Sequence, residues 1–355
     1  MGGMSKPKVP GVVIADVLDA SFPPAPQVVS ALEHQSLALA ASQPMDGVDL
    51  IQTIASVRGV PEESVTIGAG SSSLMYPALG RWLTSKSRVL LPDPTYEEYV
   101  HIIKHVVDCR VDRMILSHAN DYRVDVDSLK ALLDRGVEEK DPYDLVVLVN
   151  PNNPTGSFVE RADLEALVSK VDTRFLIDEA YIEYLGPGHS MEPFAARSEN
   201  TIVCKSLSKC YGLSDVRAAY LCGPPAFMKE LRLGSAEGVD TTARIAATEA
   251  LRSGEYYEAC YAEMRRLREE LARQLRERLP IIEVCPGAAN WILCYLPPSG
   301  PDAAVIRVRC RKHNVFVRNC EVISELFGTH TVRITVKDSV SNNRIVAALE
   351  SAMSE

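Results

Sequence analysis

Residues 145–156 read Leu-Val-Val-Leu-Val-Asn-Pro-Asn-Asn-Pro-Thr-Gly, and this stretch decides the fold. Its first five residues form a short, continuous apolar run, which is typical of a strand buried on both faces of a sheet. The proline-rich turn at 150–156 ends that run with polar groups. Similar short runs recur along the chain with helical segments between them, at 65–67, 88–91, 108–116, 175–177, 201–204 and 218–222. We therefore expect an α/β fold with a mainly parallel sheet covered by helices.

The pattern changes after Gly254, where a long charged helix is predicted. Met264, Leu267 and Leu271 belong to a set of apolar residues spaced by three and four, and Pro280 stops the helix. Short strands at 281–284, 291–296, 315–317 and 332–336 then predict a smaller α/β unit. The predicted division is an N-terminal arm with part of the small domain (1–48), a large domain (49–254), and a connecting helix with the small C-terminal domain (255–355).

Composition excludes several classes of function. The 355 residues are 46% hydrophobic and 24% charged with a net charge of -9, so neither nucleic acid nor a membrane surface is an expected partner. Nine cysteines without a Cys-x-x-Cys pair indicate reduced thiols in the cytoplasm. His101 and His105 are spaced like a ligand pair on a helix, but no carboxylate or cysteine accompanies them, so no metal site is expected.

Four polar segments stand where strands are predicted to end, which is where open α/β sheets bind ligands. They are Gly-Ala-Gly-Ser-Ser-Ser at 68–73, the turn at 150–156, Ile-Asp-Glu-Ala-Tyr at 177–181 and Lys-Ser-Leu-Ser-Lys at 205–209. Each is ambiguous by itself. The first resembles an incomplete dinucleotide loop or a tight turn, Asp178 suits a magnesium ligand or a helix cap, and Ser206-Leu-Ser-Lys209 matches the Ser-x-x-Lys pattern of acyl enzymes.

Taken together, the segments resemble the pyridoxal phosphate enzymes of the aspartate-aminotransferase fold (fold type I). Within that superfamily they are most similar to the histidinol-phosphate aminotransferase group, from about Asp19 to the C-terminus. The specific motifs are Asp93-Pro-Thr-Tyr-Glu-Glu-Tyr99, residues 151–156, Asp178-Glu-Ala-Tyr181, and Ser206-Leu-Ser-Lys209 followed by Tyr-Gly-Leu and Arg217. The resemblance implies a homodimeric enzyme with pyridoxal 5'-phosphate as cofactor, and amino acid and 2-oxo acid substrates.

The resemblance assigns the groups that meet the cofactor ring. Lys209 corresponds to the Schiff-base lysine, which then serves as general base. Asp178 corresponds to the carboxylate that pairs with the pyridine nitrogen and keeps it protonated. Asn153 and Tyr181 match the donors to the phenolic oxygen of the ring, and Tyr96 matches the aromatic side chain that stacks on the ring. The catalytic set is thus Lys209, Asp178 and Tyr181.

The cofactor phosphate requires donors and positive charge. A predicted helix start offers backbone amides at Gly70, Ser71 and Ser72. The hydroxyl groups of Ser206 and Ser208 and the forked guanidinium of Arg217 complete the set.

Two arginines on adjacent predicted strands of the small unit are candidates for binding substrate. By resemblance, Arg333 binds a substrate carboxylate, and Arg318 stands where the group has an arginine for a remote anionic end. The alternative for Arg318 is a surface arginine at the end of a strand.

The chain also departs from the pattern of the group. Asp19-Ala-Ser-Phe-Pro23 replaces the usual Asn-Glu-Asn-Pro, and Ser72 and Ser73 replace an acidic pair in the phosphate turn. Gln43 stands in place of a tyrosine that reaches the phosphate in the partner subunit, so we expect Gln43 near that phosphate. The residues expected at the reactive core of the cofactor are intact, whereas the entry that faces the substrate is altered, and this indicates a specialised relative rather than an enzyme for histidinol phosphate itself.

Transamination is the expected reaction, of an amino acid or amine that can carry a distal anion. A decarboxylase like the threonine-phosphate decarboxylases, or an arginine-cyclising or arginine-oxidising enzyme, shares the same motifs. An acyl enzyme with Ser206 as nucleophile would leave Tyr96, Asn153 and Asp178 unexplained. A non-catalytic binding protein on the same fold would not need Lys209 and its ring partners.

Overall fold

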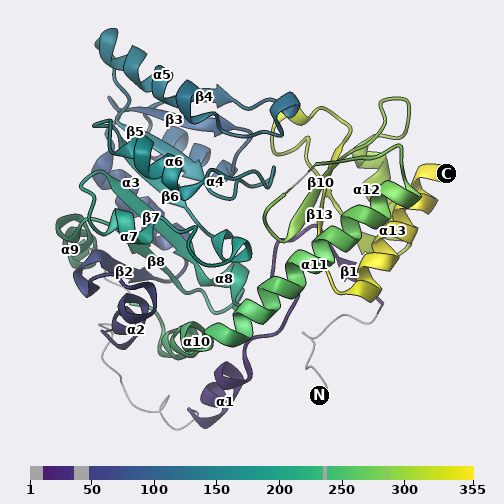
Figure 1. The fold of residues 1–355 in the computed structure, drawn as a ribbon, viewed down its shortest axis with the longest axis horizontal. Helices are drawn as coiled ribbons and strands as arrows, with labels where there is room; N and C mark the ends of the chain where they lie inside the picture. The colour runs from purple at the N-terminus through teal and green to yellow at the C-terminus, as the bar shows by residue number, and fades with distance from the viewer. Residues whose placement is uncertain (1–10, 36–47, 235–237, 286) are drawn as a thin grey trace.

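The computed structural model describes residues 11–35, 48–234, 238–285 and 287–355. A seven-stranded sheet with the order β2-β8-β7-β6-β5-β3-β4 forms its larger part (Figure 1). Its strands are β2 (Val65–Gly68), β3 (Arg88–Asp93), β4 (Arg110–Ile115), β5 (Leu145–Val149), β6 (Arg174–Asp178), β7 (Thr201–Ser206) and β8 (Ala219–Cys222). Strand β8 runs antiparallel to both of its neighbours, and the other pairs are parallel. The predicted α/β fold with a mainly parallel sheet is confirmed.

Helices cover both faces of this sheet, which explains why central strands such as β5 are apolar throughout, whereas the edge strand β4 carries charged and partly exposed residues. In β5, Val146 and Leu148 belong to one buried cluster, whereas Leu145, Val147 and Val149 belong to another. The helices that contribute to the first cluster include α1 (Pro26–His34), α2 (Val48–Arg58), α5 (Val126–Glu138), α6 (Arg161–Val168), α7 (Glu192–Ala195), α10 (Thr241–Arg252) and α11 (Gly254–Arg278). Those in the second are α3 (Ser71–Trp82), α4 (Glu97–His101) and α9 (Pro225–Gly234).

The second part of the molecule is built on an antiparallel sheet with the order β12-β13-β10-β9. Its strands are β9 (Glu283–Cys285), β10 (Trp291–Tyr295), β12 (Arg318–Asn319) and β13 (Thr331–Thr335), and its helices are α12 (Ala303–Lys312) and α13 (Ser339–Ser354). The strand predicted at 315–317 is divided, because β11 (Val315–Phe316) pairs instead with β1 (Val13–Ile14) of the N-terminal segment. The domain boundaries at 48 and 254 remain predictions.

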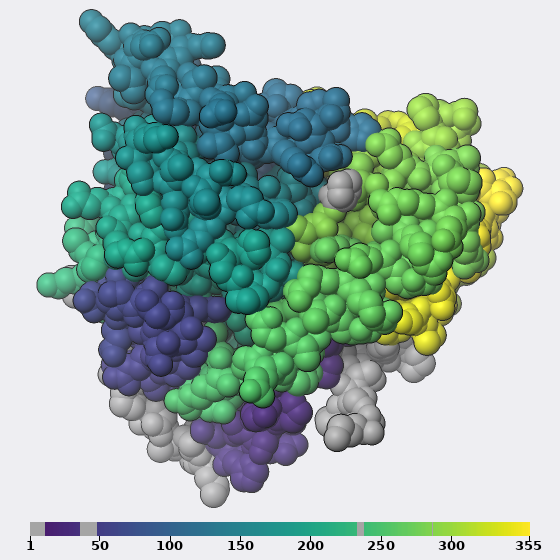
Figure 2. Space-filling model, in the orientation of Figure 1, coloured from purple at the N-terminus to yellow at the C-terminus, as the bar shows by residue number. Residues whose placement is uncertain are grey.

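Helix α11 joins the two parts and runs diagonally between them (Figure 1). The predicted apolar stripe is buried, at Met264, Leu267, Leu271 and Leu275, and the helix ends at Arg278, shortly before Pro280. The two parts meet along a hollowed seam (Figure 2), where an open groove of about 800 Å³ includes Asp121 and Ala288 in its lining. None of the helices described is long and apolar enough to cross a membrane.

Parallel pairing brings the polar segments together at one edge of the large sheet. Val149 of β5 lies opposite Asp178 of β6, and Asp178 lies opposite Cys204 of β7. The turn at 150–156, the segment at 178–181 and the segment at 205–209 therefore leave neighbouring strands at the same edge. Helix α8 (Leu207–Cys210) follows β7 directly and carries Lys209.

Candidate active site

A cavity of about 360 Å³ opens between the two sheets at this edge. Its lining combines residues from both parts of the molecule with the N-terminal segment. The predicted site residues in the lining are Ser71, Tyr96, Asn153, Asp178, Tyr181, Ser206, Lys209, Arg318 and Arg333. Its size lies within the range typical of small-molecule sites.

Of the two lysines in the segment at 205–209, only Lys209 lines this cavity. Its Nζ lies 3.2 Å from Asp19 Oδ1, and its side chain is 31% exposed. Lys205 is 3% exposed, and it forms ion pairs with Glu179, Glu183 and Glu192. Because three carboxylates bind its buried amine, Lys205 has a structural role, and Lys209 is the accessible amine.

Asp178 presents a buried carboxylate to the cavity. Its Oδ2 accepts a hydrogen bond of 2.7 Å from the Tyr99 hydroxyl, and its Oδ1 accepts one of 2.9 Å from the Ala180 backbone N–H. Burial raises the pKa of Asp178 above its ordinary value, although both hydrogen bonds and Lys205 oppose this effect. A buried anion of this kind favours a cationic partner, such as a protonated ring nitrogen.

Arg333 reaches the cavity from β13 and is 6% exposed. Its Nη1 donates to Asn153 Oδ1 at 2.7 Å, and its Nη2 donates to the Asp16 carbonyl at 3.1 Å. Its Nε is buried and has no partner among the described residues. Burial lowers the pKa of Arg333 below its ordinary value, and this desolvated cation is suited to binding an anion.

Two tyrosines contribute phenol groups to the lining. Tyr181 packs edge-on against Trp291 with ring centroids 4.8 Å apart, and burial raises the pKa of its hydroxyl. Tyr96 is 38% exposed and stands at the start of α4. Burial, with the nearby Asp178 carboxylate, raises the pKa of Tyr96 to about 12. Both hydroxyls therefore stay protonated and can donate hydrogen bonds at neutral pH.

Beside the cavity, Gly70, the start of helix α3 and Arg217 form an arrangement that suits an anion and is called the cradle below. Gly70 caps α3 with φ 95°, and no side chain caps the free N–H groups of that helix. A Cβ at Gly70 would lie 2.4 Å from Arg217 Nη2, so the guanidinium rests on a surface that only glycine leaves open. The Ser208 hydroxyl is buried and has no partner among the described residues. Ser206 Oγ accepts from the Ser208 backbone N–H at 3.4 Å.

Ser71 and Ser72 occupy the first turn of α3, and both are half-buried. Only Ser71 belongs to the cavity lining. Gly70, Ser72, Ser208 and Arg217 lie outside that lining.

Arg318 lies on β12, directly opposite Arg333 of β13 in the sheet. It is exposed, lines the cavity, and is close enough to Glu97 to influence the pKa of that carboxyl. The cavity lining therefore carries charges of both signs.

Sequence reasoning missed three residues that the structure adds to the site: Tyr99, Asp16 and Asp19. Tyr99 is the last residue of the motif at 93–99, but only the fold shows that its hydroxyl donates a hydrogen bond to Asp178. Asp19 was noted as a departure from the group, and its contact with Lys209 spans 190 positions. Gln43 lies outside the described residues.

The family model for aminotransferase class I and II matches residues 16–350. This chain belongs to that family. It is therefore an enzyme of the pyridoxal phosphate-dependent aminotransferase class, as the motifs predicted.

Among curated relatives, the uncharacterized protein y4rO of Sinorhizobium fredii is 29% identical over 341 residues, covering 92% of this chain and 52% of that protein. This chain thus spans about half the length of y4rO. The histidinol-phosphate aminotransferase of Caldanaerobacter subterraneus subsp. tengcongensis is 28% identical over 306 residues, covering 86% of this chain and 82% of that enzyme.

Solved structures share the fold at low identity. Histidinol-phosphate aminotransferase from Sinorhizobium meliloti, in complex with pyridoxal-5'-phosphate, has a TM-score of 0.83 at 21% identity and covers 97% of this chain and 91% of its own. L-threonine-O-3-phosphate decarboxylase from Porphyromonas gingivalis has a TM-score of 0.80 at 20% identity, covering 97% and 100%. These likenesses confirm fold type I.

The residues present fit the cofactor of the family. Pyridoxal phosphate supplies an aldehyde that bonds an amine and a ring that takes up electrons from the substrate carbon. Lys209 offers the amine, and the buried carboxylate of Asp178 suits the ring nitrogen. The unpartnered Ser208 hydroxyl, the uncapped helix start at Gly70 and the guanidinium of Arg217 suit the phosphate.

Proposed function

We propose that this enzyme transfers the amino group of an amino acid to a 2-oxo acid, with Lys209 as the lysine that binds the cofactor and moves the proton. The observation that carries this proposal is the placement of Lys209, Asp178 and Arg333 around one cavity. An amine, an anion for the ring and a cation for the substrate carboxylate are the three groups that the reaction requires.

Arg333 is the proposed anchor for the α-carboxylate of the substrate. Its terminal nitrogens are held by Asn153 and by the Asp16 carbonyl, which fixes the plane of the guanidinium. The buried Nε without a partner marks a donor that a bound anion can satisfy. A substrate held there shares the cavity with Lys209.

Lys209 is the proposed proton carrier. Its Nζ lies within reach of the Asp19 carboxylate, which orients the amine toward the cavity. Lys209 would hold the cofactor through its amine, and the same amine, once free, would move a proton from the α-carbon of the substrate. Tyr181 and Asn153 are proposed to donate to the ring oxygen.

The distal end of the substrate is proposed to meet Arg318, which favours a substrate with a second anion, such as glutamate or a phosphorylated amino acid. Glu97 and Asp16 line the same cavity. These two acidic residues are the observation that favours a second candidate, an arginine-modifying enzyme whose substrate ends in a cation. Because the fold is also similar to that of L-threonine-O-3-phosphate decarboxylase, decarboxylation is a third outcome to be measured.

The test is a screen of single amino acids against the purified holoenzyme. Transamination converts the cofactor to its amine form and releases a 2-oxo acid. Decarboxylation releases carbon dioxide. Arginine modification gives a product in which the guanidinium-bearing side chain is altered. Absorbance and product analysis by mass spectrometry separate these outcomes. Carbon dioxide without any 2-oxo acid would contradict the proposed transamination.

Two variants locate the substrate ends. Arg333→Lys should impair the half-reaction with every amino acid, because lysine cannot reproduce the forked contact. Arg318→Lys should impair glutamate but spare alanine. The loss of a charge-assisted pair in a closed site costs about 2–5 kcal/mol, a roughly thirty-fold to several-thousand-fold effect. Equal losses for alanine and glutamate in Arg318→Lys would show that Arg318 is structural.

The resemblance to this group also supports a cytoplasmic homodimer as the working form. The N-terminal segment is proposed to bridge the subunits and to bring Gln43 to the cofactor phosphate in the partner subunit.

A further inference from the structure

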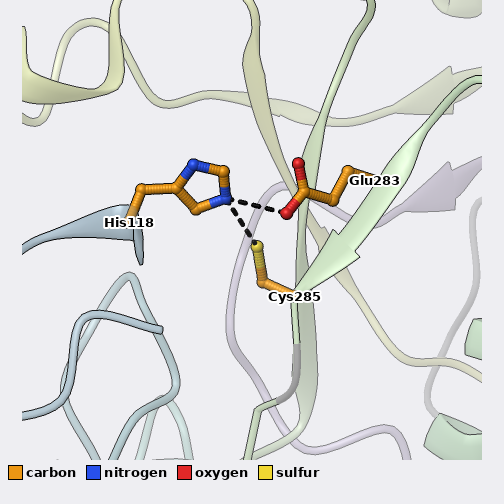
Figure 3. Close-up of side chains that lie close together, drawn as sticks. All are labelled: His118, Glu283 and Cys285. Atoms are coloured by element: carbon orange, nitrogen blue, oxygen red, sulfur yellow. Dashed lines mark hydrogen bonds and ion pairs between the residues drawn. The ribbon is translucent and has the colours of Figure 1, made fainter. Parts of the chain in front are cut away.

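Outside the active site, three side chains of metal-ligand type converge where the two sheets meet. His118 stands in the short helix η4 (His118–Asn120) after β4 of the large sheet, and Glu283 and Cys285 are on β9 of the small sheet. Because side chains two apart on a strand share a face, Glu283 and Cys285 point in the same direction. Figure 3 shows the His118 ring directing one nitrogen toward both of them. Among the described residues, this is the group of three whose ligand atoms all lie within 4.8 Å of one another.

The distances are close to those of a coordination shell. His118 Nε2 lies 2.9 Å from Glu283 Oε1 and 3.9 Å from Cys285 Sγ. Bonds of about 2.0–2.3 Å from zinc to nitrogen, oxygen and sulfur place tetrahedral ligand atoms roughly 3.3–3.8 Å apart. Shifts of less than about 1 Å therefore suffice to bring the three atoms around one ion. One imidazole, one carboxylate and one thiolate form a donor set that suits zinc better than magnesium or calcium.

The histidine is held in place by neighbours that are not ligands. Its ring stacks on Tyr295 with centroids 4.1 Å apart and an interplanar angle of 28°, and on Tyr122 at 5.8 Å. Tyr295 lies directly opposite Glu283 in the pairing of β10 with β9. The same strand pair therefore fixes the histidine ring and both residues that face it.

A simple ion pair does not explain the arrangement. The side chains of His118 and Glu283 are 40% and 61% exposed, and an ion pair this exposed to solvent stabilises a fold little. The third member, Cys285, is 5% exposed and is not needed for that pair.

We infer that His118, Glu283 and Cys285 bind one zinc-type divalent cation, with water at the remaining position. Binding displaces the thiol proton of Cys285 to solvent, and His118 coordinates through Nε2 while Nδ1 carries the ring proton. The ion links the part of the molecule that contains Lys209 to the part that contains Arg333 and adds stability to their junction. This site departs from the expectation, drawn from sequence, that the chain holds no metal.

Zinc binding to the holoenzyme tests the inference. Free cofactor and metal are removed by gel filtration after treatment with a chelator, and zinc is then titrated by equilibrium dialysis with elemental analysis. One zinc per chain is expected, together with a zinc-dependent rise in Tm. Cobalt should give a thiolate-to-cobalt charge-transfer band in the difference spectrum between wild type and Cys285→Ser at equal cofactor content.

Variants separate this site from other zinc-binding groups. Glu283→Gln and Cys285→Ser should each weaken zinc binding at least about 100-fold, since even indirect partners of a metal contribute ten- to hundred-fold. Cys260→Ser, at a partly exposed cysteine elsewhere, is the matched control and should bind as wild type does. If Cys285→Ser does not fold, Glu283→Gln still decides, because that side chain is largely exposed. Absence of bound zinc, or equal zinc affinity in wild type and Glu283→Gln, would overturn the inference.

Discussion

Replacing Asp178 by asparagine separates the charge of this residue from its shape. The side chain is 5% exposed and holds two hydrogen bonds, from the Tyr99 hydroxyl and the Ala180 N–H. Asparagine has almost the same volume, accepts through its oxygen, and can donate to the tyrosine oxygen. We therefore expect Asp178→Asn to fold and to retain most of its cofactor, because Lys209 and the phosphate cradle are unchanged.

The activity should fall sharply. Removing one member of a buried charge pair costs about 3–5 kcal/mol. Since each 1.36 kcal/mol is a factor of ten in rate, kcat/KM should fall by about 150- to 5,000-fold. The assay is steady-state turnover with the best amino acid found in the screen, at matched cofactor content. Turnover near that of wild type would refute the role of Asp178 as the ring's charge partner.

The cofactor-free protein gives an independent measurement of the same charge. Because burial raises the pKa of Asp178 in the folded state, its ionisation costs stability. This cost is absent below the unfolded-state pKa of about 3.9 and grows as the pH rises through the higher folded-state pKa. Cofactor-free Asp178→Asn should therefore have a higher Tm than wild type at neutral pH, and the difference should shrink toward acid pH. A Tm difference that does not change with pH would contradict this reasoning.

Three further predictions concern the cofactor phosphate and assembly. Gly70→Ala should weaken cofactor binding at least about tenfold, because the new Cβ imposes a strained φ and lies against Arg217. The control variant Gly80→Ala has open space around the new Cβ and should bind the cofactor normally. Equal cofactor affinities of the two variants in a fluorescence titration would contradict the role of the cradle. Ser208→Ala should leave the Tm of the cofactor-free protein unchanged or higher, since the Ser208 hydroxyl has no partner among the described residues. The same variant should weaken cofactor binding about tenfold to a hundredfold. Unaltered cofactor affinity would show that Ser208 does not belong to the site. Sedimentation should show a dimer, and an active monomer would contradict the proposed assembly.

The strands of the large sheet could be predicted because burial on both faces leaves a continuous apolar run, as in β5. Their ends could also be predicted, since polar motifs such as the segment at 205–209 interrupt those runs. The pairing of β1 with β11 could not, because two residues of extended chain carry no pattern of their own.

Contacts between distant segments account for what sequence reasoning missed at the site. Nothing local to Asp19 shows that its carboxylate meets Lys209, and nothing local to His118 shows that β9 faces it. Such contacts depend on how the two sheets are placed, which no spacing within one segment determines. By contrast, the adjacency of Arg318 and Arg333 followed from two neighbouring predicted strands, and the sheet register confirms it.

The position of the lysine that carries the cofactor tests the function most directly. Holoenzyme is treated with borohydride, which fixes the cofactor to its lysine, and the digested protein is mapped by mass spectrometry. We expect the label on Lys209 and none on Lys205, whose amine is held by three glutamates. Lys209→Ala should lose the label. A label on another lysine, or a label that persists in Lys209→Ala, would contradict the proposed site.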